Sequence, residues 1–75
     1  MKTDTNRYFV TENRINHPDI GFYNTYGIIY QPAAQAIQIL DISPNAKKVI
    51  HMVMSFNQSG LAPEHFRDAV EDLLA

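Results

Sequence analysis

The hydrophobic pattern of this chain changes its period at one point, and that change divides the sequence into two structural halves. Before Ser43, β-branched and aromatic residues alternate with polar ones over much of the chain, which is typical of β-strands. After Pro44, apolar residues recur every three or four positions, the period of an amphipathic helix. The pattern therefore predicts an α+β domain in which a sheet precedes the helices.

Turn-forming residues divide the first half into three strands. We expect strands over residues 7–15, 20–31 and 36–42, with "NHPDIG" as the first turn. Pro18 and Pro32 mark the breaks, because proline lacks the N–H group that a strand ladder needs. Short connections favour antiparallel neighbours in the order 1-2-3. Residues 1–6 are polar and expected to be flexible, which leaves residues 7–75 as a single small domain.

The second half predicts two helices. Ser43 is the expected N-cap and Pro44 the first residue of a helix that ends near Gly60, with an apolar face of Ala46, Val49, Ile50, Val53 and Phe56. The second helix begins at Pro63 without a capping side chain at Ala62, and its apolar stripe is Phe66, Ala69, Val70, Leu73 and Leu74. Because only about three residues join the helices, they should form a C-terminal two-helix hairpin packed on one face of the sheet.

Size and charge restrict the functions that this chain can perform. A chain of 75 residues has a small core, and the absence of cysteine excludes disulfides and thiolate metal sites as its support. The net charge is −2 and the basic residues are scattered, which argues against a nucleic-acid partner. There is no apolar run of about 20 residues to cross a membrane, and the first residues lack the apolar core of a secretory signal. We expect a cytoplasmic protein.

The C-terminal segment "EHFRDAVEDLLA" concentrates groups that could perform chemistry, but its spacing favours a solvated helix face. Glu64, Asp68 and Glu71 point away from the apolar stripe. A metal site would need a further ligand from His17 or His51, which are expected in a turn and on an outward helix face. No activated nucleophile or phosphate-binding loop is evident. We therefore predict no catalytic, cofactor-binding or metal-binding residues.

Both faces of the predicted sheet carry apolar side chains, although one helical hairpin can cover only one of them. The uncovered face is expected to display Phe9, Tyr23, Ile29 and Leu40. Such a face could join two copies, sheet to sheet or edge to edge, or bind another protein. It could also stack on single-stranded nucleic acid, but the basic flanks that this requires are sparse. We expect a protein-interaction or self-association module; the alternative is a small-ligand-binding or site-completing subunit of an oligomeric enzyme.

Short motifs in the chain resemble a family of small uncharacterised proteins from Firmicutes. The resemblance covers roughly residues 23–75, and the matching positions are Tyr26, Gly27, Ile28, Asp41, Ile42, Ser43, Leu61, Pro63, His65, Arg67, Asp68, Val70, Glu71, Asp72 and Leu74. The chain departs from the family pattern at Ala62, where the family has Ser, and at Ala69, where it has Val. The resemblance implies a bacterial, intracellular domain. It carries over no catalytic residues.

Two residues of this motif suggest a structural latch. His65 and Arg67 lie at the edge of the apolar stripe of the second helix, while Asp41 lies where the third strand meets the first helix. A hydrogen bond from either side chain to the Asp41 carboxylate would tie the hairpin to the sheet. The alternative is that the motif binds a partner.

Overall fold

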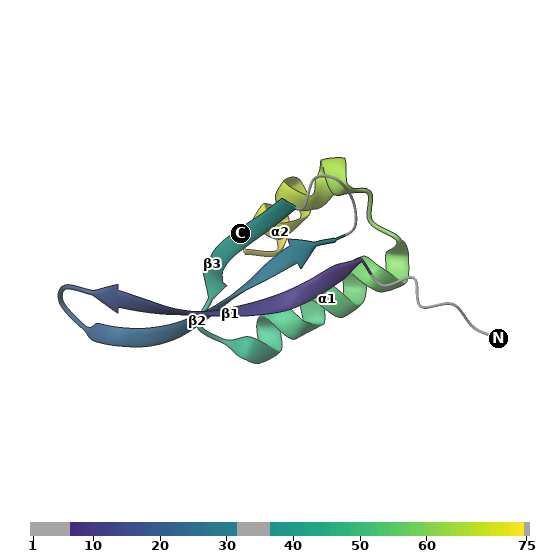
Figure 1. The fold of residues 1–75 in the computed structure, drawn as a ribbon. Helices are drawn as coiled ribbons and strands as arrows, with labels where there is room; N and C mark the ends of the chain where they lie inside the picture. The colour runs from purple at the N-terminus through teal and green to yellow at the C-terminus, as the bar shows by residue number, and fades with distance from the viewer. Residues whose placement is uncertain (1–6, 32–36, 75) are drawn as a thin grey trace.

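The computed structural model describes residues 7–31 and 37–74, and it confirms the predicted fold class. The strands are β1 (Tyr8–His17), β2 (Gly21–Tyr30) and β3 (Ile37–Ser43). They are followed by α1 (Ala46–Ser59), the 3-10 turn η1 (Pro63–His65) and α2 (Phe66–Leu74). The sheet is antiparallel in the order β1-β2-β3 (Figure 1). The expectations for residues 1–6, and for a strand start at residue 36, lie outside the described residues.

The first two strands are longer than the third, so part of the sheet has only two strands. β1 and β2 pair along their whole length, from Tyr8 opposite Tyr30 to His17 opposite Gly21. β3 pairs with β2 only between Tyr26 and Tyr30. The remainder of the β1–β2 hairpin projects from the body of the domain as a two-stranded ribbon (Figure 1). The molecule is consequently elongated, with extents of 48 × 24 × 22 Å.

Both helices pack on the same face of the sheet, and Tyr8 is the aromatic centre of the core between them. Its ring centroid lies 5.0 Å from that of Tyr30, 5.5 Å from Phe56 and 5.1 Å from Phe66. The Tyr8 hydroxyl donates a 2.7 Å hydrogen bond to the Leu61 carbonyl, so its polar atom is satisfied. The other buried apolar residues are Ile28, Val49, Met52, Val53, Phe56, Phe66 and Val70.

The C-terminal end of α1 lies where the sequence predicts it, whereas the N-cap is a different residue from the predicted one. The N-cap is Asn45 rather than Ser43, because the Asn45 carboxamide oxygen accepts from two amides of the first turn. Ser43 ends β3, and its hydroxyl accepts instead from the Asn45 N–H. At the other end α1 stops before Gly60 as predicted; Gly60 is left-handed with φ 67°, and Leu61 packs against the core.

The apolar face of α1 is rotated relative to the prediction. Ile50 was expected in the core but is 42% exposed, whereas Met52 is only 3% exposed. The reason is that α2 lies along the flank of α1 that carries Lys48 and Ser55, so the side chains between sheet and α2 are the ones that become buried. The stripe of α2 is itself only half covered, since Leu73 and Leu74 remain exposed.

Candidate functional site: the open face and outer edge of the sheet

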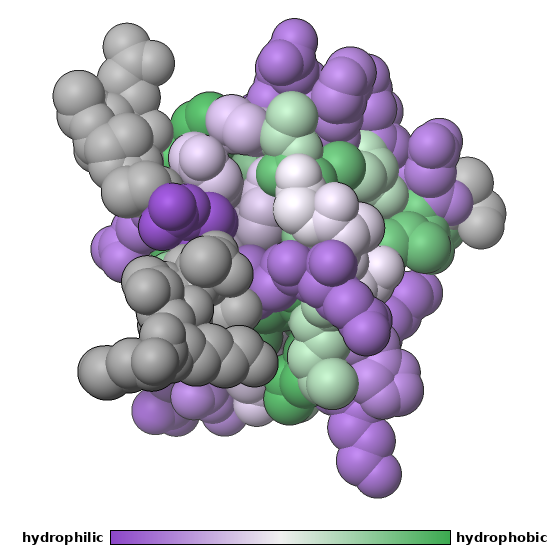
Figure 2. Space-filling model, turned by 90° about the vertical axis from the view of Figure 1, so that its right-hand side faces the viewer, coloured by the Kyte–Doolittle hydropathy of each residue, from purple (hydrophilic) through white to green (hydrophobic). Residues whose placement is uncertain are grey.

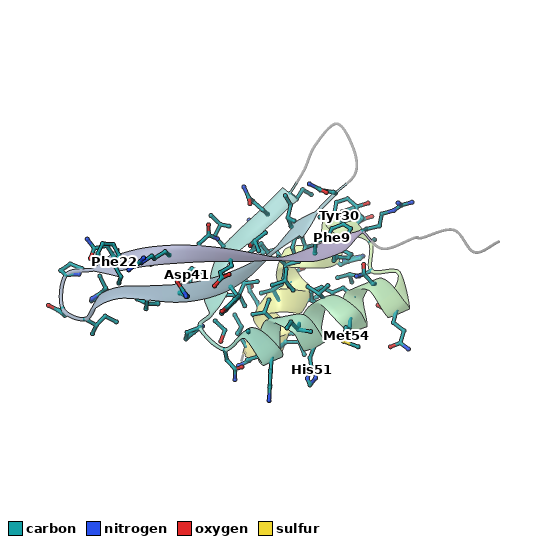
Figure 3. All side chains as sticks on the ribbon, turned by 60° about the horizontal axis from the view of Figure 1, so that its bottom comes forward. Phe9, Phe22, Tyr30, Asp41, His51 and Met54 are labelled. Carbon is teal, nitrogen blue, oxygen red and sulfur yellow. The ribbon has the colours of Figure 1, made fainter. Side chains whose placement is uncertain are left out.

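The face of the sheet away from the helices carries most of the residues predicted for it. Phe9 pairs with Ile29 across β1 and β2, and both point away from the core face of Tyr8 and Ile28. Phe9 is 41% exposed, Leu40 is 49% exposed and Ile29 is half-buried. Figure 3 shows Phe9 beside Tyr30, at the end of the sheet opposite to Phe22. Phe9 and Ile29 are paired on this face, and Leu40 is exposed on β3 where the register shift begins; we call these three residues the open-face cluster.

Tyr23 belongs to the same face but not to the same cluster. It pairs with Ile15 far along the β1–β2 ribbon. Ile29 is six positions further along β2, which corresponds to about 20 Å along a strand. The predicted interaction face is thus divided between the three-stranded part of the sheet and the ribbon.

A close strand crossing divides these two parts at Gly27. The register between β2 and β3 shifts between Tyr26 and Ile28, so several β3 residues oppose one β2 residue there. A Cβ atom at Gly27 would overlap the Ile39 carbonyl oxygen and lie 2.9 Å from the Leu40 Cα. Only glycine allows β3 to cross this closely. The bulge also breaks the alternation of faces along β3, because Ile42 packs against the core although Leu40, two positions earlier, is exposed.

The crossing is fixed by a hydrogen bond between Thr25 and Asp41. Asp41 adopts a left-handed backbone with φ 56°, an uncommon conformation outside glycine that aspartate tolerates better than most residues. This turn brings its carboxylate over β2, where Oδ1 accepts a 2.6 Å hydrogen bond from the Thr25 hydroxyl. Thr25 is completely buried. Asp41 is therefore the polar partner that makes burial of this hydroxyl possible.

The predicted latch between Asp41 and the second helix is not what the geometry shows. Within residues 7–31 and 37–74, no hydrogen bond or ion pair joins Asp41 to His65 or Arg67, because its carboxylate is turned toward Thr25. His65 and Arg67 are both exposed. The hydrogen bond that Asp41 makes lies within the sheet.

The outer edge of β1 is capped at one position by a side chain from α1. The Asn57 carboxamide oxygen accepts from the N–H groups of Arg7 and Tyr8, each at 2.9 Å. Its nitrogen donates to the Tyr8 carbonyl at 2.9 Å. Asn57 thus occupies the place that a neighbouring strand would take. Sequence reasoning missed this residue, because nothing in the local pattern distinguishes it from an ordinary polar residue near a helix end.

Two polar side chains on the open face have atoms that are buried without a partner. The Thr11 hydroxyl and the Asn13 side-chain nitrogen make no hydrogen bond to any described residue. Thr11 pairs with Gly27 and Asn13 with Thr25, so both lie beside the crossing of β3 over β2. Unpartnered buried polar atoms are uncommon in folded proteins and call for an explanation.

Two tyrosines have altered acidity, and both pKa values are shifted in the same direction. Burial, and in second place the neighbouring Tyr30, raises the pKa of the Tyr8 hydroxyl. The Glu12 carboxylate raises the pKa of Tyr26 through its charge, with smaller contributions from burial and from a 3.3 Å hydrogen bond between the two side chains. Both tyrosines are neutral at physiological pH, so these shifts do not indicate an acid or base for catalysis.

Two cavities lined by described residues lie at the helices. One, of about 250 Å³, is lined by Lys48, His51, Met52, Ser55 and Leu73 between α1 and α2. A second, of about 310 Å³, lies between the start of β1 and the Gly60–Pro63 segment and includes Arg7 and Asn57. Figure 2 views the molecule from this end, where apolar side chains show as separated patches among hydrophilic ones.

Within the described residues, no three His, Cys, Asp or Glu side chains gather closely enough to hold a metal ion. None of the helices described has the length and apolar character needed to cross a membrane.

Comparison of the chain with protein-family models, with curated proteins and with solved structures gives no match. The resemblance to the Firmicutes family stays a prediction.

Proposed function

We propose that this chain is a small protein-interaction module, which binds a second protein chain through its sheet. The open-face cluster of Phe9, Ile29 and Leu40 is the observation that carries the proposal. An antiparallel sheet that faces water on one side normally places polar residues there. Here two large apolar side chains, Phe9 on β1 and Leu40 on β3, are more than two-fifths exposed on the strands that flank β2. The sheet would bury them against a partner.

The shape of the domain supports the same function. A narrow ribbon extends the sheet beyond the area that the helices cover, which lengthens the surface available to another chain (Figure 1). The candidate partners are a second copy of this chain or a different protein. The bacterial, intracellular setting that the resemblance implies belongs to this proposal as well.

A ligand-binding role is the second candidate, and the cavity beside Tyr8 is the observation that favours it. Its volume of about 310 Å³ is at the lower end of what small-molecule sites require. The polar atoms of Asn57 in this cavity are already bound to β1, which leaves the Arg7 guanidinium as its charged group. A thermal-shift screen of small anions would test this role, with Arg7→Ala as the variant that should lose any shift.

The interaction proposal is tested with Phe9→Ser and Leu40→Ser variants. Leu74→Ser is the matched control, because Leu74 is similarly exposed at 43% but lies on α2. Self-association is measured by sedimentation over a range of concentrations, and binding of other proteins by affinity capture from cell extract. We expect both open-face variants to lose binding that the wild type and the control retain. Binding that is unchanged in both open-face variants would refute the role of this face.

A further inference from the structure

The outer edge of β1 presents backbone groups that no described strand pairs with. The Gln31 N–H donates to the Arg7 carbonyl at 2.8 Å, which fixes the alternation of the β1–β2 ladder. Odd-numbered β1 residues direct their backbone groups toward β2, and even-numbered residues direct theirs outward. Asn57 occupies the outward groups of Tyr8. The remaining outward positions of β1 are Val10, Glu12, Arg14 and Asn16, and no strand of the described chain pairs with them.

We propose that a second copy of this chain pairs antiparallel with this edge, β1 against β1, around a two-fold axis at Asn13. The inference goes beyond the proposed function, because it uses the backbone edge of β1 rather than the open-face cluster. In this register Glu12 of one copy lies opposite Arg14 of the other, and Val10 lies opposite Asn16. All four outward residues then exchange backbone hydrogen bonds with the other copy. The two sheets become one continuous six-stranded sheet with the helices of both copies on one side.

Charge selects this register over its neighbours. A shift by one hydrogen-bonding step in one direction places Glu12 opposite Glu12, and a shift in the other direction places Arg14 opposite Arg14. Like charges directly opposite each other destabilise a strand pair, whereas opposite charges stabilise it. Each shift also leaves an outward position unpaired, because Asn57 blocks the edge at Tyr8 and Pro18 follows β1. Backbone geometry and charge therefore favour the same alignment.

The unpartnered side chain of Asn13 gains a partner in this arrangement. At the two-fold axis the two Asn13 residues form a non-hydrogen-bonded backbone pair, where opposing side chains approach most closely. The Asn13 nitrogen has no partner within the described part of one copy, and an amide turned with both polar atoms toward the axis would donate to the oxygen of the other copy.

Exposed apolar residues on the helix side fit the same alignment. Phe22 points to that side near the tip of the ribbon and is 62% exposed, with the Arg14 guanidinium 4.6 Å from its ring centroid. Ile50 and Met54 lie on the flank of α1 opposite to α2, and Figure 3 shows Met54 pointing away from the sheet. Antiparallel pairing brings the ribbon of each copy alongside this flank of the other, so both apolar surfaces become shielded.

The test is a charge exchange on the purified full chain, measured by sedimentation equilibrium. Glu12→Arg and Arg14→Glu each place like charges opposite one another, and we expect the dimer dissociation constant of each to rise about tenfold. An equimolar mixture of the two variants restores opposite charges, and so does the double variant Glu12→Arg/Arg14→Glu. Both should associate nearly as tightly as the wild type.

Glu64→Arg and Arg67→Glu are matched controls, because they change the net charge equally at exposed positions outside the edge. Circular dichroism confirms that each variant is folded. A wild type that stays monomeric throughout, or single variants that dimerise unchanged, would overturn this inference. The proposed function is judged separately by Phe9→Ser and Leu40→Ser: if these abolish binding while the edge variants do not, the module stands and the edge pairing fails.

Discussion

Thr25 and Asp41 form a hydrogen bond of 2.6 Å that joins a fully buried hydroxyl to a carboxylate at the surface. The bond spans the site where β3 crosses β2, and it exists only because Asp41 takes a left-handed backbone conformation. Loss of a partner for a buried hydroxyl costs more than the hydrogen bond itself contributes to stability. The crossing therefore depends on one side chain that lies on the outside of the molecule.

Replacement of Asp41 by alanine should destabilise the domain by about 2–3 kcal/mol, since it leaves the Thr25 hydroxyl unpartnered and places a Cβ-bearing residue without side-chain compensation at positive φ. Chemical denaturation monitored by circular dichroism measures the loss. Asp41→Gly removes the same acceptor but relieves the backbone strain, so it should be less destabilising than alanine. Asp41→Asn retains an acceptor and should be the mildest; equal stability of all three variants would contradict this account.

Gly27→Ala should prevent the close crossing of β3 and cost several kcal/mol, because the added Cβ overlaps backbone atoms that have no room to move. Gly21→Ala is the control: its φ is 79°, but a Cβ there meets no atom within 4 Å, so only strain of about 1 kcal/mol is expected. Thermal unfolding of the two variants compares steric overlap with backbone strain. A smaller effect at Gly27 than at Gly21 would show that the crossing is looser than described.

Asn57→Ala should destabilise the domain by about 1–3 kcal/mol, because it leaves both backbone groups of Tyr8 without their partner. Hydrogen exchange at the Tyr8 amide should accelerate in parallel. Gln58→Ala, at the exposed neighbouring position, should change stability by less than about 0.5 kcal/mol. Unchanged exchange at Tyr8 in the Asn57 variant would contradict the capping role.

Stability should decrease at alkaline pH through Tyr8. Its pKa in the folded protein is raised above the unfolded value of about 10, so the folded state retains the phenol proton more strongly. The stabilising contribution is complete below pH of about 10 and is lost as the pH rises through the folded pKa. Tyr8→Phe should flatten this dependence while losing the bond to Leu61. Urea denaturation at pH values from 8 to about 11 compares the variants.

The architecture could be predicted from the sequence because its signals are local. The change of period near Ser43, the prolines at the strand ends and Gly60 at the helix end each act over a few residues. The N-cap was misplaced by two positions because Ser43 and Asn45 both have suitable side chains. The pairing of Ser43 with Tyr26 decides between them, and strand pairing is not a local property.

The details of the candidate site depended on contacts between distant parts of the chain. A pattern of alternating residues placed Phe9, Ile29 and Leu40 on one face, but it could not show the bulge that turns Ile42 to the core. Asp41 was selected for its position at the end of a strand, whereas its partner Thr25 follows from the register of β2 and β3. Met52 replaces Ile50 in the core for a similar reason, because the position of the second helix decides which flank is covered.

The bonds of Tyr8 also have a consequence for synthesis. Its backbone is held by a side chain 49 positions later, and its hydroxyl by a carbonyl 53 positions later. During synthesis Tyr8, the centre of the aromatic core, therefore leaves the ribosome long before the groups that bind it. The apolar face of the nascent β-hairpin therefore stays exposed to solvent until the chain has been synthesised beyond Leu61. Such transiently exposed apolar surface is what chaperones bind during synthesis.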